Sequence, residues 1–210
     1  MNVSFRILAV TGAIAAFAPP AQAQLVYVGV RAGAGIPTGS FAETGQGASQ
    51  DPYLKGANPG LGYGLDAGVG LGPLGVYAGL DHINFGCQDQ SCASSGKYKL
   101  SGISAGVRLG VPLIPLIKPW VKAGITLNEM TGTVGGSATA TKITTDRRPG
   151  YELGAGVDIP VMVLFNLTPQ VRYIGQKLKY SATSAGVTTR GEKRADYYTF
   201  DLGFRLRSPF

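Results

Sequence analysis

Long apolar runs and reactive side chains are both scarce in this chain of 210 residues, which has one histidine, two cysteines and one tryptophan. Beyond its first residues, no apolar run reaches the roughly 18 residues that a membrane-spanning helix needs. One histidine and two cysteines are too few for the ligand clusters of a metal site. We therefore expect no helical membrane anchor, no metal and no cofactor.

Clustered positive charge is also missing, although the chain carries a formal net charge of +7. Its lysines and arginines are scattered among alternating segments and loop tips instead of gathering on one helix. This scatter excludes the usual footprint of a nucleic-acid-binding protein, and we expect no nucleic-acid partner.

The first 23 residues have the three parts of a cleavable export signal. Arg6 supplies the positive region, residues 7–18 form the apolar region, and Ala21 to Ala23 form a small-residue cleavage site. Cleavage after Ala23 leaves one domain over residues 24–210, and its net charge is +6 because Arg6 is the only charge lost. The sequence therefore predicts an exported protein.

Glycine, in contrast, is abundant, with 32 residues in the sequence, many of them inside regular segments. In each segment, of about ten residues, apolar side chains recur at every second position, as they do from Tyr198 to Leu206. About eight such segments follow one another, separated alternately by short proline-bearing breaks and longer polar breaks. This pattern predicts antiparallel strands with one apolar face.

The opposite face of these segments carries charges of both signs. Alternation alone does not choose between a soluble sandwich and a barrel. The export signal, the even number of segments and the C-terminal Phe210 favour an eight-stranded antiparallel up-and-down transmembrane β-barrel. Charges inside it must pair, because an unpaired buried charge costs on the order of several kcal/mol. The expected lumen charge network comprises Arg31, Asp66, Asp81, Arg108, Lys122, Glu152, Asp158, Arg172, Asp201 and Arg205.

The longer breaks predict extracellular loops at 37–59, 86–97, 131–150 and 181–194. Aromatic residues near the strand ends, Tyr27 and Trp120 among them, are expected to form girdles at the membrane surfaces. Basic residues of the last two loops indicate a rim that contacts anionic lipopolysaccharide, the alternative being that they only keep the loops solvated. The rim residues are Arg147, Arg148, Arg190 and Arg194.

The alternating strands and the terminal Phe210 together resemble the small outer-membrane β-barrel family, which includes opacity-type surface antigens and eight-stranded barrels of the OmpA and OmpX type. The resemblance covers the whole mature chain and rests on architecture. It implies insertion into a bacterial outer membrane, with outer-membrane lipid and the barrel-assembly machinery as partners. The C-terminal assembly signal would consist of Phe204, Leu206 and Phe210.

The two cysteines and the histidine favour structural roles. Cys87 and Cys92 lie in the second expected extracellular loop, where an oxidising compartment favours a disulfide between them. His82 follows Asp81, and adjacent strand residues point to opposite faces. The histidine-x-serine arrangement of the lipid A deacylases, which belong to barrels of this size, is absent. We therefore expect no enzyme activity.

These features predict a monomeric outer-membrane protein with a structural or surface-interaction role, whose loops make the contacts with any surface ligand. The first alternative is a narrow pore or carrier for small solutes, because inward glycines leave gaps. The second is a lipid A-modifying enzyme. Charges of both signs throughout the lumen favour the plugged barrel.

Overall fold

The computed structural model describes residues 25–43, 54, 56–87, 97–111, 117–134, 141–184 and 186–209. The expected signal peptide, Cys92 and Phe210 lie outside the described residues. Within them, the chain forms nine antiparallel strands and one short 3₁₀ helix. None of the described helical segments is long and apolar enough to cross a membrane.

The strands follow one another along the chain, and most exceed ten residues because the period-two alternation runs on without interruption. Their bounds, with those of the helix η1, are β1 Leu25–Thr38, η1 Gly39–Phe41, β2 Ala57–Leu71, β3 Leu74–Cys87, β4 Lys97–Gly110, β5 Lys118–Val134, β6 Thr141–Thr145, β7 Arg148–Pro160, β8 Phe165–Ser184 and β9 Val187–Pro209.

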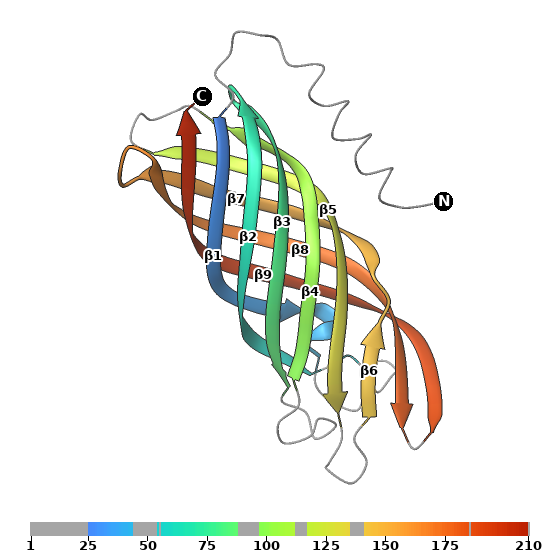
Figure 1. Ribbon diagram of the computed structural model, residues 1–210. Coiled ribbons are helices and arrows are strands. Elements are labelled where there is room, and N and C mark those ends of the chain that lie inside the picture. The colour runs from blue at the N-terminus through green and yellow to red at the C-terminus, as the bar shows by residue number, and fades with distance from the viewer. Residues whose placement is uncertain are drawn as a thin grey trace, which may run out of the picture.

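The sheet closes on itself, because β1 pairs with β2 along one edge and with β9 along the other (Figure 1). Strands β6 and β7 both pair with β5 and β8, so they occupy one position that is interrupted at Asp146 and Arg147. The barrel thus has eight strand positions. The prediction of an eight-stranded antiparallel barrel is confirmed.

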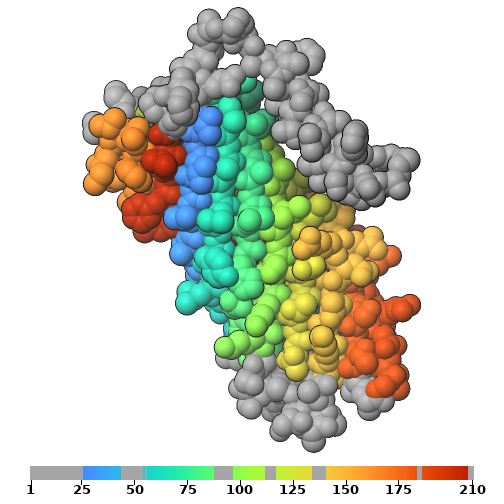
Figure 2. Space-filling view, viewed as in Figure 1, coloured from blue at the N-terminus to red at the C-terminus, as the bar shows by residue number. Residues whose placement is uncertain are grey.

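An apolar band covers the outer wall of the barrel. Alternation turns one set of side chains outward on every strand, and Figure 2 shows them forming a continuous surface over β1 to β5. Val28 is 54% exposed and Leu202 is 49% exposed. Such a surface is stable against hydrocarbon and costly against water. The exposed band includes Val28, Val30, Leu65, Leu80, Val107, Ile125, Leu153, Phe200, Leu202 and Phe204.

Toward the extracellular end, the polarity of the two faces is exchanged: outward positions become polar and inward positions become apolar. On β8, Val171 faces outward and Arg172 faces inward, but further along Lys177 and Lys179 face outward while Leu178 is fully buried inside. A strand that leaves hydrocarbon for water needs this reversal, because its outer face must become polar. The inner face is then free to form an apolar core.

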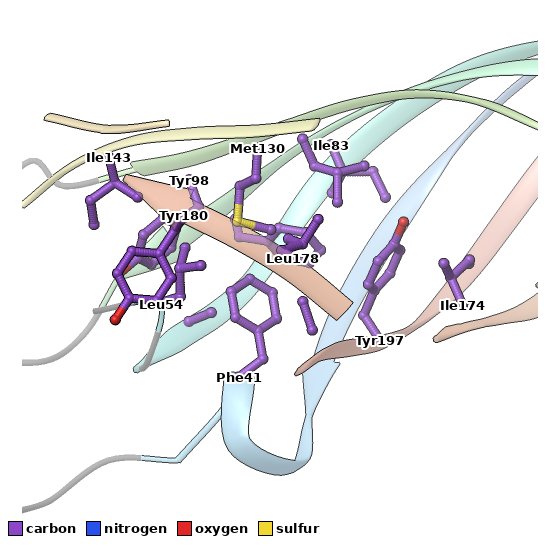
Figure 3. Close-up of a cluster of buried hydrophobic side chains, with 14 of the residues drawn as sticks. Phe41, Leu54, Ile83, Tyr98, Met130, Ile143, Ile174, Leu178, Tyr180 and Tyr197 are labelled. Atoms are coloured by element: carbon purple, nitrogen blue, oxygen red, sulfur yellow. The ribbon is translucent and has the colours of Figure 1, made fainter. Parts of the chain in front are cut away.

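That core is a buried hydrophobic cluster inside the extracellular end of the barrel. Figure 3 shows its side chains from strands on different sides of the barrel gathered around Phe41. The rings of Phe41 and Phe85 meet edge-on with centroids 5.3 Å apart. The cluster consists of Phe41, Leu54, Ala57, Ile83, Phe85, Tyr98, Leu100, Met130, Ile143, Ile174, Leu178, Tyr180, Ala182, Ala195 and Tyr197.

Two of the four expected extracellular loops are wrong in extent. Most of 131–150 is strand, belonging to β5, β6 and β7. Most of 181–194 is a hairpin, because β8 continues to Ser184 and β9 begins at Val187. The cause is the change in polarity: the polar residues that resemble a loop in the sequence are the outward positions of strands in water.

Candidate functional site

The lumen holds a connected set of charged side chains contributed by every strand except β6. The structure brings all ten residues of the expected network into ion pairs, and Arg207 joins them. Alternation places each of these side chains inward. The pairing partners follow from strand register and tilt, which the sequence pattern does not specify.

Arg172 on β8 is the centre of the extracellular half of this network. Its side chain is 2% exposed, and it lies 2.9 Å from Asp81, 2.9 Å from Asp201 and 3.4 Å from Glu152. Asp81 belongs to β3, which does not neighbour β8 in the sheet. This ion pair therefore crosses the lumen. Lys122 completes this half by pairing with Glu152.

Arg31 on β1 connects this half to the rest. Its guanidinium lies 2.9 Å from Asp81 and 3.0 Å from Asp66, and it also donates to the carbonyl oxygens of residues 65 and 80. The space for this side chain comes from Gly64, where an added Cβ would lie 2.9 Å from the guanidinium carbon of Arg31. Glycine is required here because a long side chain crosses its backbone closely.

Asp158 on β7 is the centre of the periplasmic half. It accepts hydrogen bonds from Arg108 and Arg205, both at 2.7 Å, and from Arg207. Arg205 also reaches Asp66 at 3.2 Å, which links the two halves. Three guanidinium groups thus share one carboxylate, the inverse of the arrangement around Arg172.

Two aromatic rings lie inside the barrel beside these arginines. The Trp120 indole donates to Asp158 at 3.0 Å, and its ring lies 4.4 Å from the Arg108 guanidinium. The Tyr27 ring lies 4.4 Å from the guanidinium of Arg205. Such contacts stabilise a buried cation. The expectation that Trp120 and Tyr27 form surface girdles is therefore wrong, since both point inward.

The outer wall carries aromatic residues where the alternation reverses. Tyr151, Tyr173 and Tyr198 face outward and contact one another in sequence, with ring centroids 5.9 Å and 5.0 Å apart. Tyrosines concentrate at this depth because the ring is apolar and the hydroxyl needs water. They lie where the outward face of these strands changes from apolar to charged side chains.

Beyond these tyrosines lies a group of exposed basic side chains that we name the basic strip: Lys142, Lys177, Lys179, Arg190 and Arg194. Strand pairing places Lys177 opposite Arg194 and Ser181 opposite Arg190. Arg194 donates to the Tyr151 hydroxyl at 3.2 Å. A hydrogen bond with Tyr173 and the nearby Asp196 carboxylate raise the pKa of Arg194.

The four expected rim arginines do not share one environment. Arg147 pairs with Glu129 at 3.0 Å, and both side chains are exposed. Arg148 begins β7 and is half-buried, whereas Arg190 and Arg194 belong to the basic strip. Exposed pairs such as the first contribute about 0–1 kcal/mol to stability.

His82 lies on β3 and faces outward, whereas Asp81 faces inward, as the alternation predicts. The His82 Nδ1 atom lies 2.9 Å from the hydroxyl oxygen of Ser101 on β4, a contact between strands that no local sequence pattern reveals. Glu129 lies opposite Ser101 on β5 and pairs with Arg147. Among the described residues, no three histidine, cysteine or acidic side chains are grouped as metal ligands.

The remaining expected residues lie at strand ends. Cys87 ends β3, and the disulfide with Cys92 stays a prediction because Cys92 lies outside the described residues. Phe204 and Leu206 face outward on β9. Their role in assembly stays a prediction, as does that of Phe210.

A family model described as "Outer membrane protein beta-barrel domain" matches residues 7–207. Among curated proteins, none matches this chain.

Several solved structures share the fold. Neisserial surface protein A has a TM-score of 0.59 and 18% identity, over 86% of this chain and 96% of that one. A major outer membrane protein from Thermus thermophilus has a TM-score of 0.57 and 15% identity, over 87% and 99%. OprG from Pseudomonas aeruginosa has a TM-score of 0.57 and 14% identity, over 90% and 97%.

The family match covers almost the whole described barrel, and the outward apolar band agrees with the membrane location of these proteins. At this low sequence identity, the structural neighbours show a shared fold and do not show a shared function. This chain belongs to the outer membrane protein beta-barrel domain family, and its location is the outer membrane.

Proposed function

We propose that this protein is a sealed, monomeric outer-membrane barrel with a structural or surface-interaction role, and that it does not conduct solutes. The observation that carries the proposal is the ion pair between Arg172 and Asp81, which joins opposite walls of the lumen at 2.9 Å. A closed sheet also has no free edge within the membrane that demands a second copy.

The charged network supports a seal within the membrane. The carboxylates of Asp66, Asp81, Glu152 and Asp158 each contact two or more cations. A passing ion would have to separate such pairs in surroundings of low dielectric constant, where leaving one buried charge unpaired costs about 3–5 kcal/mol. The network therefore opposes both water and ions.

The apolar cluster supports a second seal at the extracellular end. Phe41, Phe85, Leu100 and Met130 are each completely buried within it. Dry apolar constrictions exclude ions because no polar group replaces their hydration shells. A solute would have to cross this cluster before it reached the charged network.

Efflux from liposomes tests the seal. Liposomes containing the refolded mature chain should retain potassium ions as well as protein-free liposomes do. The single variants Arg172→Ala and Phe41→Ala should each leave one seal intact, and the double variant should leak. Potassium release that rises with the amount of wild-type protein would overturn the proposal and favour a narrow pore.

We also propose that the basic strip contacts phosphate groups of lipopolysaccharide. Support comes from its depth, directly beyond the outward Tyr151, Tyr173 and Tyr198, where anionic head groups meet the protein. Its bases outnumber the nearby acids Glu192 and Asp196.

Charge neutralisation tests this contact. Replacing Lys177, Lys179 and Arg190 with glutamine should weaken lipid A binding in detergent, whereas Arg147→Gln should not, because Arg147 already pairs with Glu129. Unchanged binding by the triple variant would contradict the contact and leave solvation as the role of these residues.

We propose no catalytic role for His82 and Ser101. An activated serine needs an acid that orients its histidine and donors that stabilise an oxyanion. Here the acid Glu129 lies opposite Ser101 on the neighbouring strand and not beside His82. It is also already paired with Arg147. Loss of a lipid deacylase activity in a Ser101→Ala variant would refute this view.

A further inference from the structure

We propose that the periplasmic mouth of the barrel binds one small oxyanion of the phosphate class, held by Arg108, Arg207 and Lys118. This site lies at the end of the lumen opposite the basic strip. It lies at the periplasmic edge of the charged network, where Arg108 and Arg207 pair with Asp158.

The first support is an imbalance of charge. At the periplasmic end, Arg108, Arg205 and Arg207 converge on the single carboxylate of Asp158, which is 1% exposed. Part of the charge of Arg205 is balanced by Asp66. No other carboxylate side chain of the described residues points into this end of the barrel, so positive charge remains in excess.

The second support is unsatisfied hydrogen-bonding capacity. The Nε atoms of Arg108, Arg205 and Arg207 are buried and have no hydrogen-bond partner among the described residues. A buried N–H without a partner is unfavourable, because it has lost its hydrogen bonds to water and gained none in the protein. The aromatic rings of Trp120 and Tyr27 offset the charge of two guanidinium groups, but ring faces do not accept the in-plane N–H bonds.

The third support is access from water. Arg108 and Arg207 form the outer edge of the network, with side chains 13% and 16% exposed, whereas Arg205 behind them is 5% exposed. Lys118, the first residue of β5, lies opposite Asp158 in the strand pairing. It is exposed and makes no ion pair in the described part of the chain. These three cations therefore lie at the same end of the barrel, around Asp158.

The type of anion follows from the type of donor. A guanidinium group donates two parallel N–H bonds to two oxygen atoms of a tetrahedral or planar oxyanion. Chloride is a single atom and cannot accept both bonds on separate oxygens. The side chains point into the lumen, so the ligand arrives through water and not from a lipid in the bilayer. A free oxyanion fits these conditions.

The test compares the thermal unfolding midpoint of the refolded mature chain in uncharged detergent, in sodium phosphate and in sodium chloride of equal ionic strength. Phosphate should raise the midpoint saturably, by about 3–6 °C at ten times its Kd. Broadening of the ³¹P resonance of inorganic phosphate should report the same binding.

Variants separate the site from general salt effects. The shift should disappear in Arg207→Gln and in Lys118→Gln, and the second variant breaks no described ion pair. It should persist in Lys99→Gln, which removes an exposed charge near the extracellular end. An equal midpoint in the two salts, or an equal shift in all variants, would overturn the proposal. So would a shift caused by phosphatidylglycerol but not by inorganic phosphate.

Discussion

Asp158 shows how one side chain can organise a membrane-embedded interior. Its carboxylate accepts hydrogen bonds from three arginines, from the Trp120 indole and from the Thr168 hydroxyl. Alternation predicts that Asp158 points inward. It does not predict this convergence, because the donors come from four different strands whose register is set by the whole barrel.

The first prediction concerns this carboxylate. Asp158→Asn should lower the free energy of unfolding by about 3–5 kcal/mol, because it leaves buried guanidinium groups without their counter-ion. Urea unfolding in detergent micelles, followed by the fluorescence of Trp120, measures the change. Glu129→Gln is the control and should cost about 0–1 kcal/mol, because its ion pair with Arg147 is exposed. Equal losses in the two variants would contradict the network's role.

A second residue-scale prediction concerns Gly64. Gly64→Ala should destabilise the barrel by about 1–3 kcal/mol, because the new methyl group meets the Arg31 guanidinium at 2.9 Å and the Leu80 carbonyl oxygen at 2.6 Å. Gly110→Ala is the matched control, with its nearest contact at 3.5 Å. The same unfolding assay applies. A Gly64 variant as stable as the control would mean that Arg31 moves aside without loss.

At the scale of elements, β8 and β9 have 20 and 23 residues. A strand crosses a membrane with roughly 9–11 residues, so about half of each lies outside the hydrocarbon. The membrane half could be predicted from sequence, because Leu167 and Val171 alternate with polar residues. The extracellular half could not, because Lys177 and Lys179 take the outward positions and the apolar face moves inside.

The element-scale prediction tests this reversal. Leu178→Ala should cost about 2–5 kcal/mol, as expected for a fully buried leucine. The neighbouring Lys179→Ala should change stability by no more than about 0.5 kcal/mol, because its side chain is exposed. If the two variants were equally stable, the hairpin beyond the membrane would contribute no core.

At the scale of the whole molecule, the barrel has a polarised interior. Acids surround Arg172 toward the extracellular side, and arginines surround Asp158 toward the periplasmic side. Beyond the charged network, at the extracellular end of the barrel, lies the apolar cluster around Phe41. Sequence reasoning predicted the eight strand positions and the inward charges. The apolar cluster was missed because its members are dispersed over expected loops and strand ends.

The measurement that tests the account most directly is electrical recording across a planar bilayer containing the refolded mature chain. The sealed barrel predicts no stepwise conductance in wild type. It also predicts conductance steps once the Arg172→Ala and Phe41→Ala substitutions are combined. Stable open states of the wild-type barrel, with conductance proportional to salt concentration, would contradict the account and show that the lumen is a pore.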